Sequence, residues 1–135
     1  MIMETLEKDG KRFAFVIRKD SNIQGKEFLS KDEDLIQVGF MNLKKGDSID
    51  PHFHKFYERK IERTSEVIYI LEGKVKVNIY ENKKKVIDTI IEKGDLIVLL
   101  SGGHGFEILE DTKFFEVKQG PFIGAENDKE KFEEK

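Results

Sequence analysis

Apolar and polar residues alternate with a period of two through most of this chain. The clearest case is the stretch "KVKVNIY" at 74–80, where Val75, Val77 and Ile79 fall on one face and polar side chains on the other. Such alternation is typical of a β-strand, because successive side chains point to opposite faces of a sheet. Similar short runs cover residues 12–17, 34–43, 51–57, 66–71, 85–91, 96–100, 104–109 and 113–119.

Turn residues separate these predicted strands. They include Gly73 and the pairs Glu81-Asn82, Gly94-Asp95 and Asp111-Thr112. No segment shows a convincing helical period. Many short strands at nearly regular spacing predict an all-β sandwich or barrel.

Two segments fit the alternation less well. Residues 57–65, "YERKIERTS", are polar and predict either a loop or an extended strand edge. Residues 125–135 form a charged C-terminal tail with one aromatic residue, Phe132. Two interpretations of this tail stay open: a solvated terminus, or a short helix that Phe132 pins to the body. With no repeat and no linker, we expect residues 1–135 to form a single domain.

Composition narrows the classes of function. The 135 residues carry a net charge of -3, from 24 Lys+Arg and 27 Asp+Glu, with the two signs interleaved. We therefore expect no nucleic-acid partner, which would need a concentrated positive face. No apolar run approaches the roughly 20 residues of a membrane span, so we expect a cytoplasmic protein with no membrane partner. The absence of cysteine leaves only nitrogen and oxygen ligands for any metal.

The three histidines suggest such a metal site. His52 and His54 lie on one face of a predicted strand, about 6.6 Å apart at roughly 3.3 Å per residue, and His104 follows two glycines. Either Glu58 or Glu66 could supply a carboxylate. The rival interpretation is that this H-x-H pair is a common feature of strands and binds no metal. Three imidazoles and one carboxylate suit divalent Fe, Mn, Ni, Co, Cu or Zn and leave positions open for a substrate.

Two stretches carry a family resemblance. In "GDSIDPHFH…EVIYILEG", Gly46 precedes His52 by five intervening residues, and Glu66 precedes Gly73 by six. The later "GDLIVLLSGGHGF" ends at His104. Together they resemble the paired motifs of the cupin superfamily, over about residues 34–119. Three departures stand out: Leu100 replaces the family's proline, one residue instead of two separates Gly102 from His104, and Ile108 stands where the family has asparagine.

The resemblance implies a cupin-type jelly-roll β-barrel of two antiparallel sheets. It also implies that His52, His54, Glu66 and His104 bind one divalent transition metal. Glu66 is preferred because six residues and a glycine follow it, which Glu58 lacks. Residues 55–65 are then an insertion between ligands, whose Tyr57, Arg59 and Arg63 could shape the pocket entrance. Cupins of this kind commonly form homodimers, and we expect the predicted strand at 12–17 to be the paired or exchanged edge.

The C-terminal stretch "HGFEILEDTKFFEVKQGPF" looks like small single-domain cupins associated with surface polysaccharide and nucleotide-sugar biosynthesis. This resemblance implies an enzyme acting on a small carbohydrate or nucleotide-sugar metabolite, of isomerase, epimerase or iron-dependent oxygenase type. The alternative is a non-catalytic module that binds or senses a metal or a sugar.

Two further groups of side chains have two interpretations each. Glu116 and Lys118 share one strand face with Phe114 and could act as catalytic proton-transfer groups if that face lines the cavity. If the face points outward, they form a solvated charge pair. Phe53, Phe106 and Tyr69 are candidates for pocket walls or for core packing.

Overall fold

The structure is a computed structural model, and it describes residues 3–134. Within these residues the protein is almost entirely β, with antiparallel strands and one short helix. The elements are β1 (Met3–Lys8), β2 (Lys11–Ile17), β3 (Gly25–Phe28), β4 (Gly39–Asn42), β5 (Glu66–Glu72), β6 (Lys74–Glu81), β7 (Lys84–Glu92), β8 (Leu96–Leu99), β9 (Gly103–Ile108), β10 (Lys113–Lys118) and α1 (Ala125–Asp128). The prediction of an all-β protein is confirmed.

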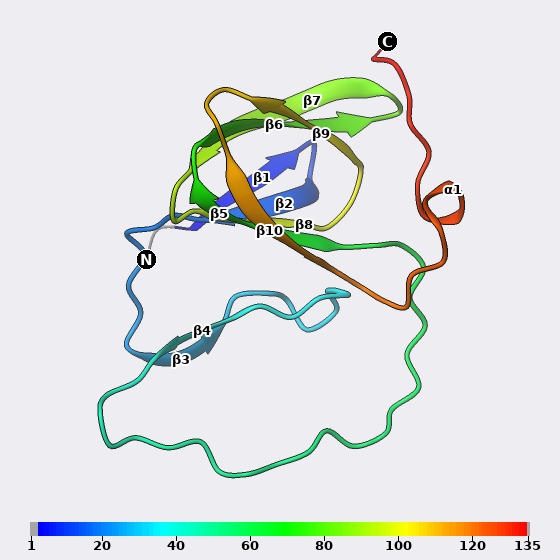
Figure 1. The fold of residues 1–135 in the computed structure, drawn as a ribbon. Coiled ribbons are helices and arrows are strands. Elements are labelled where there is room, and N and C mark those ends of the chain that lie inside the picture. The colour runs from blue at the N-terminus through cyan, green and yellow to red at the C-terminus, as the bar shows by residue number, and fades with distance from the viewer. Residues whose placement is uncertain (1–2, 135) are drawn as a thin grey trace.

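Two sheets form the body of the molecule. One has the strand order β1-β2-β8-β5-β10 and the other the order β7-β6-β9. Apolar side chains from both sheets share one core, including Phe13, Ile68, Val77, Ile91 and Ile97. This body of two packed sheets is called the sandwich here (Figure 1). Among the described residues the two sheets do not close into a barrel.

The open side of the sandwich lies at β9 and β10. These strands follow one another in the chain, and each is the last strand of its own sheet. β9 pairs only with β6, and β10 pairs only with β5, among the strands that the structure describes. Each therefore has one free edge.

The tight turns lie at, or within one residue of, the positions that the sequence predicts. Gly73 joins β5 to β6 with a φ of +99°, and a Cβ there would collide with the carbonyl oxygen of Asp111. Asn82 and Lys83 join β6 to β7 with φ values of 53° and 65°. Two positive φ angles in a two-residue loop give the backbone twist that a tight hairpin requires.

Several predicted strands need correction. Of the predicted strand at 34–43, only residues 39–42 form a strand. The residues before them form a loop, which is held by side-chain hydrogen bonds of Ser30 and Gln37 and by the Arg12–Asp34 ion pair. Residues 51–57 form no strand, because no neighbouring strand pairs with them. The predicted strand at 12–17 is not an edge, since β2 lies between β1 and β8. It is therefore not free to pair with a second chain.

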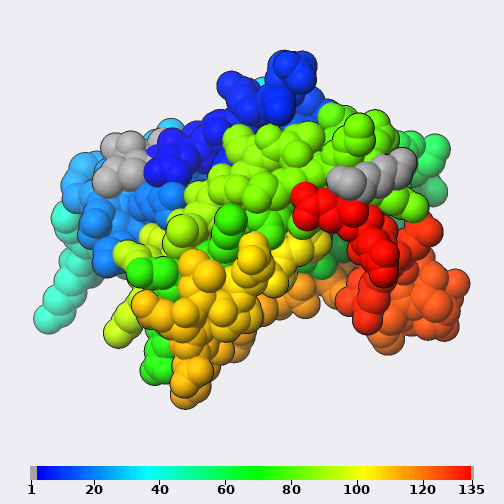
Figure 2. Space-filling view, turned by 90° about the horizontal axis from the view of Figure 1, so that it is seen from above, coloured from blue at the N-terminus to red at the C-terminus, as the bar shows by residue number. Residues whose placement is uncertain are grey.

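The C-terminal tail packs on the sandwich. α1 is a single helical turn, and the ring of Phe132 stacks edge-on against Tyr80 of β6, with centroids 5.3 Å apart and planes at 83°. Figure 2 shows the tail lying against the strands β6 and β7. This agrees with the interpretation of a short helix pinned by Phe132. Among the described residues no helix has the length and apolar content to cross a bilayer.

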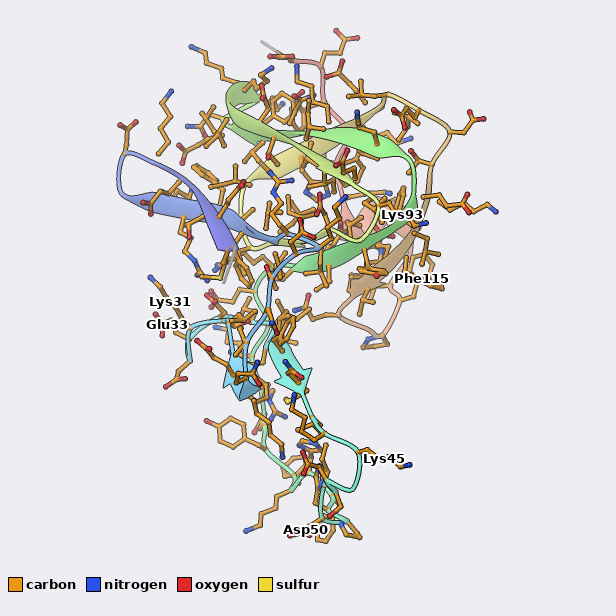
Figure 3. The ribbon with its side chains drawn as sticks, turned by 90° about the vertical axis from the view of Figure 1, so that its left-hand side faces the viewer. Lys31, Glu33, Lys45, Asp50, Lys93 and Phe115 are labelled. Atoms are coloured by element: carbon orange, nitrogen blue, oxygen red, sulfur yellow. The ribbon has the colours of Figure 1, made fainter. Side chains whose placement is uncertain are left out.

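Residues 43–64, called the arm here, run outside the sandwich and rejoin it at Arg63 and Thr64. Every residue of the arm is exposed, and none belongs to a strand or a helix. The arm continues the two-stranded ribbon β3–β4 away from the body, so that Lys45 and Asp50 lie far from Phe115 on the sandwich (Figure 3). It returns at Ser65, whose backbone N–H donates to Oε1 of Gln119 at 2.6 Å.

Candidate functional site

The inner face of β5 and β10 carries the first part of the site. Lys118 is paired with Glu66, and Glu116 with Ile68. Opposed residues in an antiparallel pair project from the same face of the sheet. Ile68 is buried in the core between the two sheets. Glu66, Glu116 and Lys118 are therefore on the face that looks into the sandwich, as one of the two interpretations predicts.

His104 reaches the same region from the other sheet. It is the second residue of β9 and is paired with Ile79, which is fully buried, so the imidazole also lies on the inner face. Its Nε2 atom is 3.1 Å from Oε2 of Glu66. The structure thus brings together the glutamate and the third histidine that the sequence selects, although 38 positions separate them in the chain.

The buried oxygen of Glu66 lacks a hydrogen bond. Oε2 is almost inaccessible to solvent and has no hydrogen bond of regular geometry, although Nε2 of His104 lies 3.1 Å away. A buried carboxylate oxygen without a donor is costly and requires an explanation, such as a bound ion. The oxygen and the imidazole nitrogen both suit a divalent transition metal.

The surroundings keep Glu66 charged. The close nitrogen of His104 acts as a donor that lowers the pKa of Glu66 by more than burial raises it, and a hydrogen bond with the Glu116 side chain and the positive charge of Lys118 lower the pKa further. Glu66 is therefore a carboxylate at neutral pH, as a metal ligand must be.

Lys118 is held by a second carboxylate. Its Nζ atom lies 3.2 Å from Oδ2 of Asp128, whose Oδ1 accepts a hydrogen bond from the Thr64 hydroxyl at 2.9 Å. The hydrogen bond to Asp128 raises the pKa of Lys118, so this residue stays protonated at neutral pH. The sequence did not point to Asp128, because it lies in a charged tail and meets Lys118 only after the chain bends at Gly120-Pro121.

Aromatic rings wall one side of the site. Phe106 stacks against His104 with centroids 5.6 Å apart, and its ring lies 6.1 Å from that of Phe114. Phe106 also packs against the core, so it fits the core-packing interpretation as well as that of a pocket wall. Tyr69 is no pocket wall here, because it lies beside Phe115 on the outer face of the sheet.

The other two histidines lie elsewhere in the chain. His52 and His54 are exposed on the arm, with their rings edge to face at 5.5 Å and 72°. Nδ1 of His52 lies 2.8 Å from the carbonyl oxygen of Asp50. Glu58 is on the arm too, and exposed. Within residues 3–134 the structure gathers no three potential ligands around one point, but places them as two pairs.

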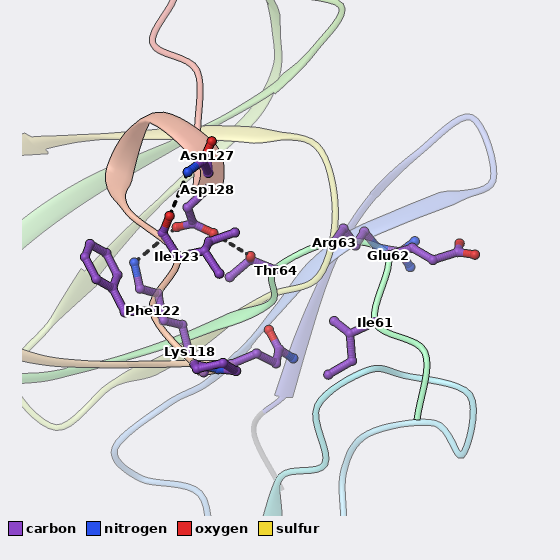
Figure 4. A pocket seen from close by; sticks show the side chains of 12 residues that line it. Ile61, Glu62, Arg63, Thr64, Lys118, Phe122, Ile123, Asn127 and Asp128 are labelled. Carbon is purple, nitrogen blue, oxygen red and sulfur yellow. Dashed lines mark hydrogen bonds and ion pairs between the residues drawn. The ribbon is translucent and has the colours of Figure 1, made fainter. Parts of the chain in front are cut away.

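A cavity of about 530 Å³ adjoins the end of β10. Lys118 and Asp128 line it together with Arg63 and Asn127 (Figure 4). Lys118 thus belongs both to this cavity and to the inner face that carries Glu66. The cavity offers cationic, amide and carboxylate groups within reach of one small polar molecule.

Comparisons with models of known protein families, with curated proteins and with solved structures found no match for this chain. The cupin resemblance therefore depends on the motif residues and their spacing.

Proposed function

We propose that this protein is a metal-binding cupin and an enzyme acting on a small carbohydrate or nucleotide-sugar metabolite. The observation that carries the proposal is the buried, unpaired Oε2 of Glu66 beside Nε2 of His104. His52, His54, Glu66 and His104 are the proposed ligands. A closed jelly-roll barrel belongs to the same proposal, with the arm supplying the strand that closes the open side.

The donor set suits divalent Fe, Mn, Ni, Co, Cu or Zn, since it offers imidazole nitrogen and carboxylate oxygen and no thiolate. When bound, such a metal supplies Lewis acidity that polarises a carbonyl or enediolate oxygen, and iron would also permit oxygenase chemistry.

The remaining polar residues suggest how a proton could be moved. Isomerisation and epimerisation take a proton from a carbon beside a carbonyl group and return it elsewhere. Glu116, on the inner face next to Glu66, is the proposed base. Lys118 is a poor base, because Asp128 raises its pKa. Its proposed role is to bind an anionic group of the substrate.

The cavity at the end of β10 is the proposed substrate pocket. Its volume of about 530 Å³ lies within the range of roughly 300–1,000 Å³ typical of small-molecule sites. Arg63 and Lys118 supply positive charge for a phosphate or carboxylate, and Phe122 offers a ring face to a sugar. These groups are those expected for a sugar phosphate or a nucleotide sugar.

Elemental analysis tests the metal. The protein as purified, or after reconstitution with each candidate ion, is expected to hold about one ion per chain. Less than roughly a tenth of an equivalent under all of these conditions would contradict the proposal.

Turnover is tested by solvent-deuterium incorporation into candidate sugars and nucleotide sugars, followed by NMR. Deuterium is expected next to the carbonyl carbon with the wild type and with Glu110→Gln, an exposed control in the β9–β10 turn. Incorporation is expected to fall by about 10²–10⁴-fold in Glu116→Gln, the range that general acid–base catalysis contributes.

A non-catalytic module is the second candidate. The Lys118–Asp128 ion pair favours this candidate, because the ammonium group of Lys118 is already paired and is less available to an anionic substrate. A metal-loaded protein that binds sugars but incorporates no deuterium would establish this alternative.

A further inference from the structure

The arm has the properties of a strand that lacks its sheet. Phe56 and Phe53 are 94% and 85% exposed, and Ile49, Tyr57 and Ile61 are also exposed. Between residues 48 and 64 no backbone group is hydrogen-bonded to another backbone group of the described chain. A contiguous set of bare apolar side chains marks a surface that contacts a partner.

The free edges of β9 and β10 have the complementary properties. Phe115 and Val117 of β10 are 62% and 57% exposed, and Ile108 and Leu109 at the end of β9 are exposed as well. An unpaired strand edge displays N–H and C=O groups that bind another extended segment, and proteins normally cover such an edge. Addition of a strand at an edge is a common mode of recognition.

The alternation in the arm matches the two sides of such an added strand. In "PHFHKFY", His52, His54 and Phe56 share one face, and Phe53 and Tyr57 share the other. With the first face turned inward along the open side, the two imidazoles would meet the buried oxygen of Glu66. Phe56 would then meet the rings that line the site.

The path of the arm points to a second copy as the receiving body. One end continues the β3–β4 ribbon, which is anchored to the five-stranded sheet by Phe40 and points away from it at its far end (Figures 1 and 3). The other end is tied where Nε of Arg63 donates to the carbonyl oxygen of Leu100 at 3.1 Å and where Ser65 binds Gln119. The structure thus holds residues 48–60 of the arm clear of the open edges of their own chain. A copy related by a two-fold axis can receive it and return an identical arm.

An apolar patch on the outside of the sandwich lies next to the same edge. Tyr69 and Leu71 of β5 and Phe115 and Val117 of β10 are all exposed there. The projecting ribbon carries exposed Phe28 and Met41. In an exchanged pair the ribbon of one copy would cover this patch of the other. The apolar side chains of the ribbon would then contact the apolar side chains of the patch.

We infer that the working unit is a homodimer in which each copy lays residues 48–60 of its arm across the β9 and β10 edges of the other. Each metal site then combines Glu66 and His104 of one copy with His52 and His54 of its partner. The shared ligands rest on the proposed metal function, whereas the exchange of arms does not.

Complementation between two variants tests the shared site. His52→Ala/His54→Ala disables the arm, and Glu66→Gln/His104→Ala disables the body. The two chains are co-expressed with different affinity tags, the doubly tagged pair is isolated, and Co(II) binding is measured by visible absorption and elemental analysis.

Each variant alone is expected to bind no Co(II). The mixed dimer is expected to bind about half the wild-type amount per chain, because one of its two sites combines an intact arm with an intact body. If each arm served its own body, both sites of the mixed dimer would be damaged, and absence of Co(II) would overturn the inference.

Crosslinking tests the exchange without any metal. The chain has no cysteine, so introduced thiols have no background. Phe53→Cys on one tagged chain and Phe115→Cys on the other are joined with a short bis-maleimide, and the double variant is treated in parallel. Each single variant alone is the control for links between two like positions.

Exchange predicts a covalent dimer, at twice the chain mass of 15.7 kDa, in the mixed pair and in the double variant. It also predicts a dimer by light scattering for the wild type. A linked product of single-chain mass in the double variant, or a wild-type monomer, would overturn the exchange. Dimeric crosslinks with a wild type that binds no Co(II) would support the exchange and contradict the metal site alone.

Discussion

Glu66 and Glu58 show how the position of a residue in the fold sets its burial and its contacts. Both are glutamates downstream of His54, but Glu58 is exposed on the arm, and Glu66 has one oxygen buried against His104. The sequence favoured Glu66 because six residues and a turn glycine follow it. The contact with His104 could not be read from the chain, because it joins two different sheets.

Substituting each of these two residues tests which one is the proposed metal ligand. Glu66→Gln is expected to lower Co(II) affinity by more than the roughly 10–100-fold that loss of an outer-shell partner costs, because the ligand itself loses its charge. Glu58→Gln is expected to leave the affinity within about threefold, as for an exposed charge. Competition titration with a chelator measures both. Equal losses would reject the assignment of Glu66.

Asp95 is a second buried carboxylate, and its role is to accept hydrogen bonds from three surrounding donors. It accepts hydrogen bonds from the backbone N–H groups of Lys19 and Glu92, each at 2.9 Å, and from Arg18 at 3.2 Å. Asp95→Ala is expected to lower the free energy of unfolding by about 3–5 kcal/mol, since it leaves these donors buried or unpaired. Urea denaturation measures the loss. Asp88→Asn, at a more exposed ion pair with Lys85, serves as control and should cost less than about 1 kcal/mol.

At the scale of elements, one ion pair fastens the loop after β3 to the sandwich. Both guanidinium Nη atoms of Arg12 donate to the carboxylate of Asp34, at 3.0 and 2.9 Å, and the Lys31 N–H donates to the same group. Burial raises the pKa of Asp34, but these hydrogen bonds outweigh it and hold the pKa below its ordinary value of 3.8.

This lowered pKa sets the direction of a pH effect. Because the folded protein favours the ionised form, the contribution to stability is present above the ordinary pKa and is lost as the pH falls through the lower, folded value. Asp34→Asn is expected to lower the free energy of unfolding by about 1–3 kcal/mol at neutral pH. The gap to the wild type should stay constant down to about pH 5 and shrink below about pH 4. A gap that widens in acid would contradict the pairing, and Asp32→Asn is the exposed control.

One ring helps to hold the C-terminal tail on the sandwich. Phe132 stacks on Tyr80 and lies close to Gly103. Phe132→Ala is expected to weaken the attachment of α1, which Asp128 also fastens to Lys118 and Thr64, and to cost about 0.5–1.5 kcal/mol, the value of one aromatic pair. Hydrogen exchange should then quicken at 127–129, whose N–H groups bind within the helical turn. Phe122→Ala, at an exposed ring, should leave that exchange unchanged.

Predicted and observed strands differ for a reason that also belongs to this scale. β6 is the central strand of its sheet and β7 pairs with it along its whole length, so one face of each strand is buried and the sequence alternates clearly. β3 is exposed throughout, and β1 buries only Leu6, so neither shows a clear alternation. Residues 51–57 alternate well but have no partner within the chain, and alternation alone cannot form a strand without one.

At the scale of the whole molecule, the arm is the feature that distinguishes a single chain from the proposed dimer. Its exposed Lys55, Arg59, Lys60 and Arg63 are sites for trypsin. Cleavage there is expected to slow as protein concentration rises and to slow further with Co(II), because both favour the assembled form by mass action. Mass spectrometry of the fragments measures the rate at each site. Cleavage that is independent of concentration and of Co(II) would argue that the arm stays free.

The sequence by itself determined the local features of this protein. Alternation identified most strands, turn residues identified the hairpins, and the absence of cysteine limited the donors to nitrogen and oxygen, since these properties depend on residues close together in the chain. Motif spacing also selected Glu66 and His104. Only the tertiary structure decided which sheet each strand joins, that Glu116 and Lys118 face inward, that Asp128 holds Lys118, and that the arm with His52 and His54 lies apart. Each of these depends on pairing between distant segments, for which the local sequence pattern carries no signal.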